Sequence, residues 1–248
     1  MRYLFNGLLL IGLLIQVNFV LADNTRDKQQ VKYVYDGDTI VLQNGERVRL
    51  LGINAPEIES RYRQGEEGGQ QAKNWLTRKL KHGVVFLEYD QQKKDKYKRR
   101  LAHLFLANGE HLNKGIVRAG LATLSIIPPN LVYLDELKQA QDIASEQSLG
   151  IWSMASYQPI SVAVLARSKK PLGWQRFLAS PIKIKTTAKF SRLVLTEKVD
   201  IRIPHEHLNS FPNLERYIGQ AIEIRGWASR SKGRYSILVR HPSAMIVH

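Results

Sequence analysis

The chain has 248 residues, of which 44% are hydrophobic and none is cysteine, and it carries 37 Lys and Arg against 22 Asp and Glu. A chain of this length and apolar content can bury a sizeable core and is long enough for two domains. The absence of cysteine excludes a fold that depends on disulfides, and the net charge of +15 favours a polyanionic partner.

Residues 1–22 are predicted to form a secretory signal peptide. Arg2 precedes an apolar run over residues 7–15, and Val20 and Ala22 occupy the positions that signal peptidase reads, so we expect cleavage after Ala22. An uncleaved membrane anchor is the alternative, although polar residues interrupt the run and it barely reaches the ~20 residues of a membrane span. The protein is therefore expected to be secreted or periplasmic.

Residues 23–153 are predicted to form a first domain that mixes strands and helices. Gly120 is a plausible helix stop, since glycine tolerates a left-handed cap, and Asn108-Gly109 indicates a tight turn. Strands are expected near residues 32–35, 38–43, 46–53, 84–90 and 100–106, and helices near 67–81, 112–119 and 131–148.

The first of these strands form a predicted hairpin around Asn44-Gly45. With a two-residue turn, Ile40 pairs with Arg49 and Asp38 pairs with Leu51. Asp38 and Arg49 then become diagonal neighbours on one face of the sheet. A one-residue bulge would remove this inference, and a plain surface ion pair is the alternative explanation of the two residues.

Four motifs in this order resemble the staphylococcal nuclease family. They are Asp36-Gly-Asp-Thr39, Arg49 at the start of a Leu-rich strand, Asn54-Ala-Pro-Glu57, and Asp95-Lys-Tyr-Lys-Arg99. Gly120 to Ala122 and Ile151 to Ser153 also fit, so the resemblance covers about residues 31–153. It implies an OB-like five-stranded β-barrel with about three helices, and a Ca²⁺-dependent endonuclease that hydrolyses phosphodiester bonds of DNA or RNA by metal-assisted attack of water.

The resemblance also implies roles for individual residues. Asp38, the Asn54 side chain and the Ala55 carbonyl would bind Ca²⁺, and Glu57 would orient or deprotonate the attacking water. Arg49 and Arg99 would bind the phosphate and neutralise the charge that builds on it, which suits the planar guanidinium fork. The basic turn is expected to add contacts to the substrate from Lys96, Tyr97, Lys98 and Arg100.

Three positions depart from the family pattern. Asn54 stands where a second carboxylate is expected, and because ligand charge sets Ca²⁺ affinity, we expect weaker Ca²⁺ binding. Lys98 replaces a glycine, and residues 125–127 lie where the family's prototype presents tyrosines that pack on the nucleotide base. A catalytically inactive nucleic-acid-binding protein on a nuclease scaffold is therefore the main alternative.

The positive charge is concentrated in the second half of the chain. Residues 23–153 hold 20 Lys and Arg against 17 Asp and Glu, whereas residues 154–248 hold 16 against 5. Residues 154–171 are predicted to be a linker, and residues 172–248 a small all-β, OB-like domain. Its strands are expected near residues 182–189, 193–195, 199–203, 221–227 and 235–239.

A basic OB-like domain with interspersed aromatic residues is typical of nucleic-acid binding. The expected contacts are Trp227, Arg230, Lys232 and Arg234, with a core position for Trp227 as the alternative. The polyanion could be DNA, RNA or an anionic cell-envelope surface. The histidines lack a convincing metal-ligand arrangement, so zinc is not expected, and no obligate protein partner is evident.

Overall fold

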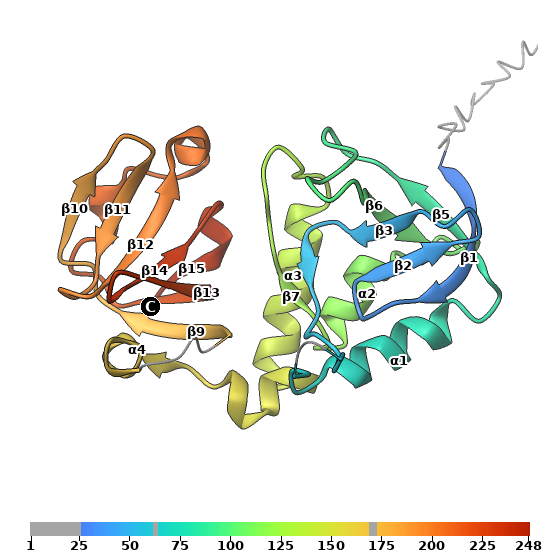
Figure 1. The fold of residues 1–248 in the computed structure, drawn as a ribbon, viewed down its shortest axis with the longest axis horizontal. Helices are drawn as coiled ribbons and strands as arrows, with labels where there is room; N and C mark the ends of the chain where they lie inside the picture. Colours follow the sequence, from blue (N-terminus) through green and yellow to red (C-terminus); the bar gives the residue numbers. More distant parts are fainter. Residues whose placement is uncertain (1–25, 62–63, 169–172) are drawn as a thin grey trace, which may run out of the picture.

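The computed structural model describes residues 26–61, 64–168 and 173–248, so the predicted signal peptide lies outside the described residues. Figure 1 shows two β-rich bodies joined through helical segments. Across the described ranges, no helix has the length and apolar character needed to cross a membrane.

The first body is a closed five-stranded barrel, as expected. Its core is filled by every second residue of a strand, because successive strand residues face opposite sides. Examples are Val48 and Leu50 on one strand and Val85 and Leu87 on another. The strands run in the order β1-β2-β3-β6-β5, and β3 and β6 pair in parallel. Their bounds are β1 (Asp27–Val34), β2 (Thr39–Leu42), β3 (Arg47–Leu50), β5 (Val84–Glu88) and β6 (Arg100–Phe105).

Three helices cover this barrel, and a two-stranded sheet lies beside it. The predicted stop at Gly120 is confirmed, because its φ is +69° and its N–H donates to the Val117 carbonyl. The helices are α1 (Gly69–Lys79), α2 (Leu112–Arg118) and α3 (Leu134–Glu146), and the small sheet pairs β4 (Ile53–Asn54) with β7 (Thr123–Leu124).

The predicted register of the β2–β3 hairpin is wrong by one residue. Arg49 lies opposite Thr39, not Ile40. The loop has three residues instead of two: the Leu42 N–H donates to the Glu46 carbonyl, and Gly45 adopts a φ of +85°. A left-handed glycine at the third loop position produces this longer connection.

The second body repeats the strand order of the first. Its sheet runs β10-β11-β12-β14-β13-β9, and β12 and β14 pair in parallel, as β3 and β6 do. β9 and β10 together match the first strand of the barrel, interrupted around Pro181. Because β9 pairs with β13 and β10 pairs with β11, the sheet curls back on itself, and this body is called the second barrel below. The strands are β9 (Trp174–Ala179), β10 (Lys183–Thr186), β11 (Phe190–Val194), β12 (Val199–Pro204), β13 (Ile222–Ser231), β14 (Arg234–Leu238) and β15 (Met245–Val247).

The segment predicted as a linker is largely structured. Residues 154–168 contain a 3₁₀ turn, β8 (Ile160–Ser161), which pairs with β9, and α4 (Val162–Arg167). Val162 and Leu165 are buried in the core of the second barrel. The sequence did not predict α4, because a helix of six residues is too short to show a 3.6-residue period.

Candidate functional site

A pocket of about 340 Å³ lies on the side of the first barrel. Five residues singled out from the sequence line it: Asp38, Arg49, Asn54, Glu57 and Arg99. They come from the bend before β2, from β3, from β4 and the segment after it, and from the turn before β6. The fold therefore brings together side chains that are up to about 60 positions apart in the sequence.

Asp38 is fixed in the bend that precedes β2. Its N–H donates to Asp36 Oδ1 at 3.0 Å, and its carbonyl accepts from the Leu50 N–H at 2.8 Å. The intervening Gly37 packs so closely that a Cβ there would lie 2.6 Å from the Cβ of Ala55. Glycine is needed in this motif for close packing, and the bend, rather than strand alternation, places Asp38 beside Arg49.

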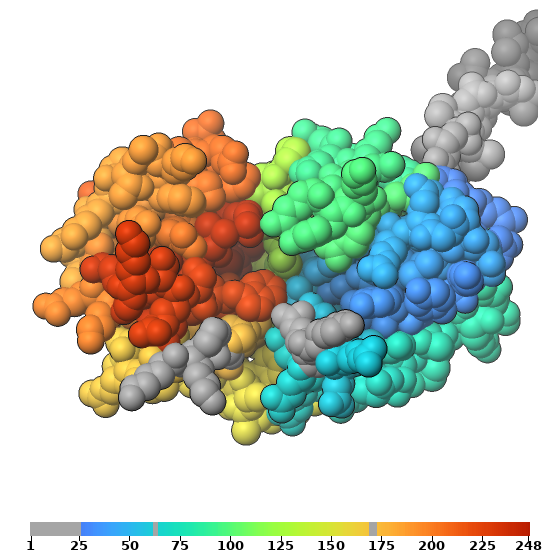
Figure 2. Space-filling view, in the orientation of Figure 1, coloured from blue at the N-terminus to red at the C-terminus, as the bar shows by residue number. Residues whose placement is uncertain are grey.

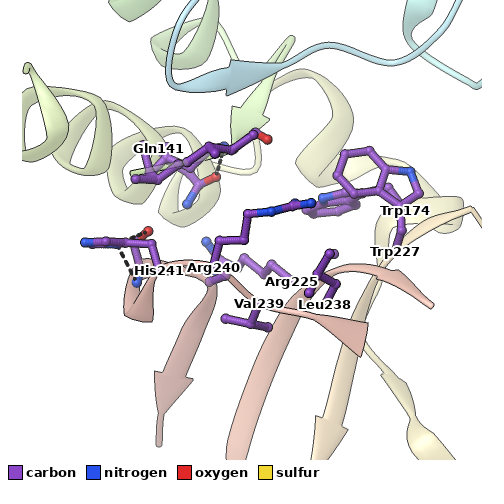
Figure 3. Close-up of a pocket in the computed structure, with 15 residues that line it drawn as sticks. Gln141, Trp174, Arg225, Trp227, Leu238, Val239, Arg240 and His241 are labelled. Carbon is purple, nitrogen blue, oxygen red and sulfur yellow. Dashed lines mark hydrogen bonds between the residues drawn. The ribbon is translucent and has the colours of Figure 1, made fainter. Parts of the chain in front are cut away.

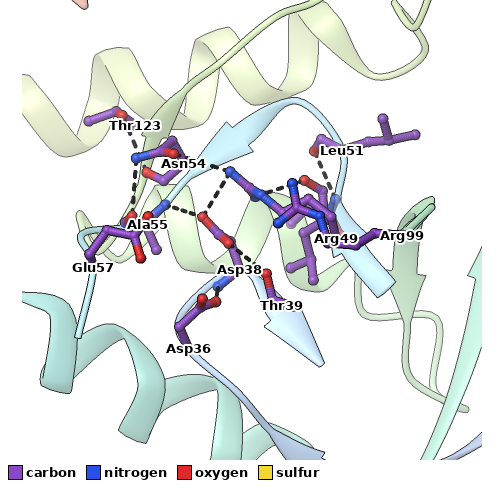
Figure 4. Close-up of polar contacts among 12 residues, drawn as sticks. Asp36, Asp38, Thr39, Arg49, Leu51, Asn54, Ala55, Glu57, Arg99 and Thr123 are labelled. Carbon is purple, nitrogen blue, oxygen red and sulfur yellow. Dashed lines mark hydrogen bonds and ion pairs between the residues drawn. The ribbon is translucent and has the colours of Figure 1, made fainter. Parts of the chain in front are cut away.

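Arg49 bridges the two side chains that were predicted to bind metal. Its Nη2 lies 3.0 Å from Asp38 Oδ2 and donates to Asn54 Oδ1 at 3.1 Å, while Nη1 donates to the Leu50 carbonyl at 3.2 Å. Figure 4 shows the guanidinium reaching from β3 toward both groups. Because of these contacts, Arg49 is held at the centre of the pocket.

The predicted metal-binding oxygens are close together. Asp38 Oδ2 accepts from the Ala55 N–H at 2.7 Å, and Asn54 Nδ2 donates to the Ala55 carbonyl at 3.0 Å. Carboxylate, amide and backbone oxygens are the ligand types that Ca²⁺ takes, so the donor set fits this ion. A cluster of three or more His, Cys, Asp or Glu ligands occurs nowhere in the described part of the chain.

Burial and neighbouring charges alter the ionisation of Asp38. Burial raises the pKa of Asp38 to about 7; Arg49 opposes this shift and Asp36 adds to it. Asp38 ion-pairs with Arg49, and the buried Asp36 lies next to it in the same bend. An added positive charge would stabilise the ionised form of Asp38.

The backbone of Glu57 is fixed by the segment that leads into α1 and by the first residue of that helix. Its N–H donates to Glu66 Oε2 at 3.0 Å, and its carbonyl accepts from the Glu66 N–H at 2.8 Å. Gly69, the first residue of α1, packs directly on this carbonyl and leaves no space for a Cβ. The side chain of Glu57 lines the pocket.

Arg99 is positioned by a turn organised around Asp95. Asp95 Oδ2 pairs with Arg99 Nε at 2.7 Å, and Oδ1 accepts from the N–H groups of Tyr97 and Arg99 at 2.8 and 3.0 Å. Lys98 has a φ of +64°, the left-handed conformation that a glycine adopts more easily. Lys96 and Tyr97 line a neighbouring cleft and not this pocket.

The other predicted contacts lie outside the pocket. Arg100 ion-pairs with Asp27 at 3.3 Å and with Glu46 at 3.6 Å instead. Trp227 is 41% exposed, which does not fit the alternative of a core position. The remaining three predicted contacts are exposed in the β13–β14 hairpin: Arg230, Lys232 and Arg234.

Sequence reasoning assigned no role to four other lining residues, Tyr35, Asp36, Thr39 and Arg47. The Arg47 guanidinium lies 4.9 Å from the centroid of the Tyr35 ring. The position of Arg47 could have been predicted from the sequence. Arg47 stands two positions before Arg49, and residues two apart on a strand share a face. Asp36 is part of the motif that contains Asp38.

Comparisons with known proteins agree with this geometry. The family model described as "Staphylococcal nuclease homologue" matches residues 47–154. A thermonuclease of Staphylococcus intermedius is 39% identical over 125 residues, which cover 49% of this chain and 74% of the relative. A thermonuclease of Staphylococcus hyicus is 32% identical over 136 residues, covering 54% and 80%. An endonuclease of Bacillus subtilis (strain 168) is 31% identical over 127 residues, covering 49% and 60%.

Proposed function

Since the chain belongs to the staphylococcal nuclease family, we propose that it is a Ca²⁺-dependent nuclease that hydrolyses phosphodiester bonds of DNA or RNA. One observation carries the proposal: Asp38, Arg49, Asn54, Glu57 and Arg99 line a single pocket. The relatives named thermonuclease and endonuclease support a nuclease. The oxygen ligands support Ca²⁺ as the metal.

Each of the five predicted residues in the pocket has a role in the proposed reaction. Asp38, Asn54 and the Ala55 carbonyl would hold Ca²⁺, which supplies positive charge next to the phosphate and lowers the pKa of water. Arg49 and Arg99 bind the non-bridging phosphate oxygens and neutralise the charge that develops on them. Glu57 orients the attacking water and accepts its proton.

The second barrel holds nucleic acid in this proposal, and the protein is exported. Residues 154–248 contain 16 Lys and Arg but only 5 Asp and Glu, which supports binding of a polyanion at the second barrel. The apolar run at residues 7–15 supports export. An anionic envelope surface would compete for the same charge and would be detected as binding to anionic but not to neutral vesicles.

Replacing Glu57 by Gln tests the catalytic role. We expect hydrolysis of single-stranded DNA and RNA by the purified protein to require Ca²⁺ and to stop on chelation. Glu57→Gln should lower kcat on the order of 100-fold or more, because the amide cannot accept the proton. The exposed Glu59 provides the matched control, and Glu59→Gln should leave kcat unchanged.

Asn54 and the Arg49–Asp38 ion pair favour a second candidate, a binding protein that has lost catalysis. In that case the protein binds single-stranded DNA but does not cut it at any Ca²⁺ concentration. Hydrolysis that persists undiminished in Glu57→Gln would likewise count against the proposed site. Either result would replace the nuclease assignment.

A further inference from the structure

A cleft of about 830 Å³ lies between the two barrels and adjoins the candidate active site. Arg49 and Arg99 line both spaces, so the cleft continues from the pocket. Its opposite wall comes from the second barrel, through Glu206, His207 and Arg240. Figure 2 shows the surface hollowed between the green segment of the first barrel and the red C-terminal segments of the second.

The outer face of the second barrel carries cations and aromatic rings into this region. Trp227 lies opposite Trp174 on β9. Arg240 lines both the cleft and a small gap between the barrels, whereas Trp227 and Leu238 line the gap alone. Figure 3 shows Arg240 extending along this gap toward the two indoles. A cation next to an exposed indole is the combination that holds a phosphate and stacks on a base.

The two walls of the cleft are joined by a packed junction. Trp152 from the first body lies under two guanidinium groups of the second, Arg176 at 5.4 Å and Arg225 at 5.0 Å from its ring centroid. Both arginines ion-pair with the buried Glu223. Trp174 packs in the same apolar cluster as Trp152. This junction gives the second barrel a defined position relative to the active site.

We propose that single-stranded nucleic acid runs from the active site through this cleft onto the second barrel, where Arg240 binds a backbone phosphate and Trp227 stacks on a base. The inference rests on the proposed function and adds a substrate class and a path. A duplex keeps its bases paired and stacked on one another, so it cannot offer a free base face to Trp227. Arg230, Lys232 and Arg234 line neither the cleft nor the small gap beside it, so the path avoids the hairpin that the sequence favoured.

Binding without cleavage tests the path. Fluorescence anisotropy with labelled oligothymidylates of 4 and 16 nucleotides, in the presence of a chelator, should show the longer strand bound more tightly. Trp227→Ala should weaken binding of the 16-mer about tenfold, whereas Trp227→Phe should retain most of the affinity. Arg240→Gln should weaken it and lower the salt dependence by about one ion.

Two further substitutions complete the test: one should strengthen binding, and the other is a control. Glu206 is an acidic group on the cleft wall with a side chain that is 77% exposed. Glu206→Gln should therefore strengthen binding of the 16-mer by about twofold, because it removes repulsion of phosphates. Arg216, an exposed arginine of the same barrel, lines a different pocket. Arg216→Gln serves as the matched control for Arg240→Gln and should have less effect.

Several results would overturn the path. These are unchanged 16-mer affinity in folded Trp227→Ala and Arg240→Gln proteins, equal weakening by Arg216→Gln, a larger loss from substitutions in the Arg230–Arg234 hairpin, or equal affinity for a duplex. Thermal unfolding identifies variants that fail to fold, for which Trp227→Phe and Arg240→Lys supply the comparison. A protein that shows the expected binding but never cuts DNA contradicts the proposed function alone. A protein that cuts but binds both lengths equally contradicts the path alone.

Discussion

At the residue scale, Asn54 sets the charge of the proposed metal site. Arg49 Nη2 lies within 3.1 Å of oxygens on both Asp38 and Asn54, so a bound cation and this guanidinium would share the same ligands. An amide oxygen attracts Ca²⁺ less strongly than a carboxylate does, because it lacks a formal charge. Asn54 therefore favours a site that fills only at raised Ca²⁺ concentrations.

Restoring a carboxylate tests this explanation. Asn54→Asp should lower the Ca²⁺ concentration for half-maximal hydrolysis on the order of tenfold, since ligand charge sets affinity. Calorimetry with Ca²⁺ alone should show the same change without substrate. Asn74→Asp adds the same charge on the exposed side of α1 and should have little effect. An unchanged Ca²⁺ requirement in Asn54→Asp would mean that residue 54 is not a ligand.

The sequence predicted the composition of the pocket better than its contacts. Asp38, Arg49 and Asn54 were identified from sequence motifs. That identification does not depend on strand pairing, so the error in register did not affect it. The contact of Asp38 with Arg49 was predicted from strand alternation, whereas the bend at Gly37 produces it. Arg240 was not predicted as a cleft residue, because the packing of one barrel against the other is not encoded in any local pattern.

At the element scale, the turn before β6 contains local strain at Lys98. A left-handed residue with a Cβ costs about 1 kcal/mol or more, which glycine avoids at a smaller entropic cost. Lys98→Gly should therefore raise the free energy of unfolding by about 0.5 kcal/mol, measured by urea denaturation. Lys96→Gly removes the same charge in the same turn, but Lys96 has no positive φ. It should lower the free energy of unfolding instead, and the same sign for both variants would argue against strain at Lys98.

Helices of several turns were predicted reliably from their hydrophobic periodicity, and shorter elements were not. The three helices of the first domain lie where periodicity placed them. α4 was missed because it has fewer than two turns, and β9 was missed because it follows a basic segment that resembles a linker. The hairpin register depended on whether the loop contained two residues or three, which Asn44-Gly45 leaves open.

At the scale of the whole molecule, Glu223 holds the second barrel against the first. Its side chain is 2% exposed and pairs with Arg176 and Arg225, which in turn stack on Trp152. Glu223→Gln keeps the shape but leaves two mostly buried guanidinium groups without their carboxylate. Breaking a buried pair of this kind costs about 3 kcal/mol. Urea unfolding should show this loss, whereas Glu215→Gln, an exposed position in the same barrel, should change the free energy of unfolding very little.

The stabilisation by Glu223 should depend on pH in a defined direction. Burial alone would raise the pKa of Glu223, but its two arginine partners outweigh burial and hold the pKa below the ordinary value of 4.5. Above pH 4.5 the carboxylate is ionised in both states, so its stabilisation is fully present. As the pH falls from 4.5 through the lower folded-state value, the unfolded chain binds the proton first and the stabilisation is lost. The difference in unfolding free energy between the wild type and Glu223→Gln should therefore be constant near pH 7 and shrink below pH 4.5. A difference that grows on acidification would show that Glu223 is not ionised in the folded protein.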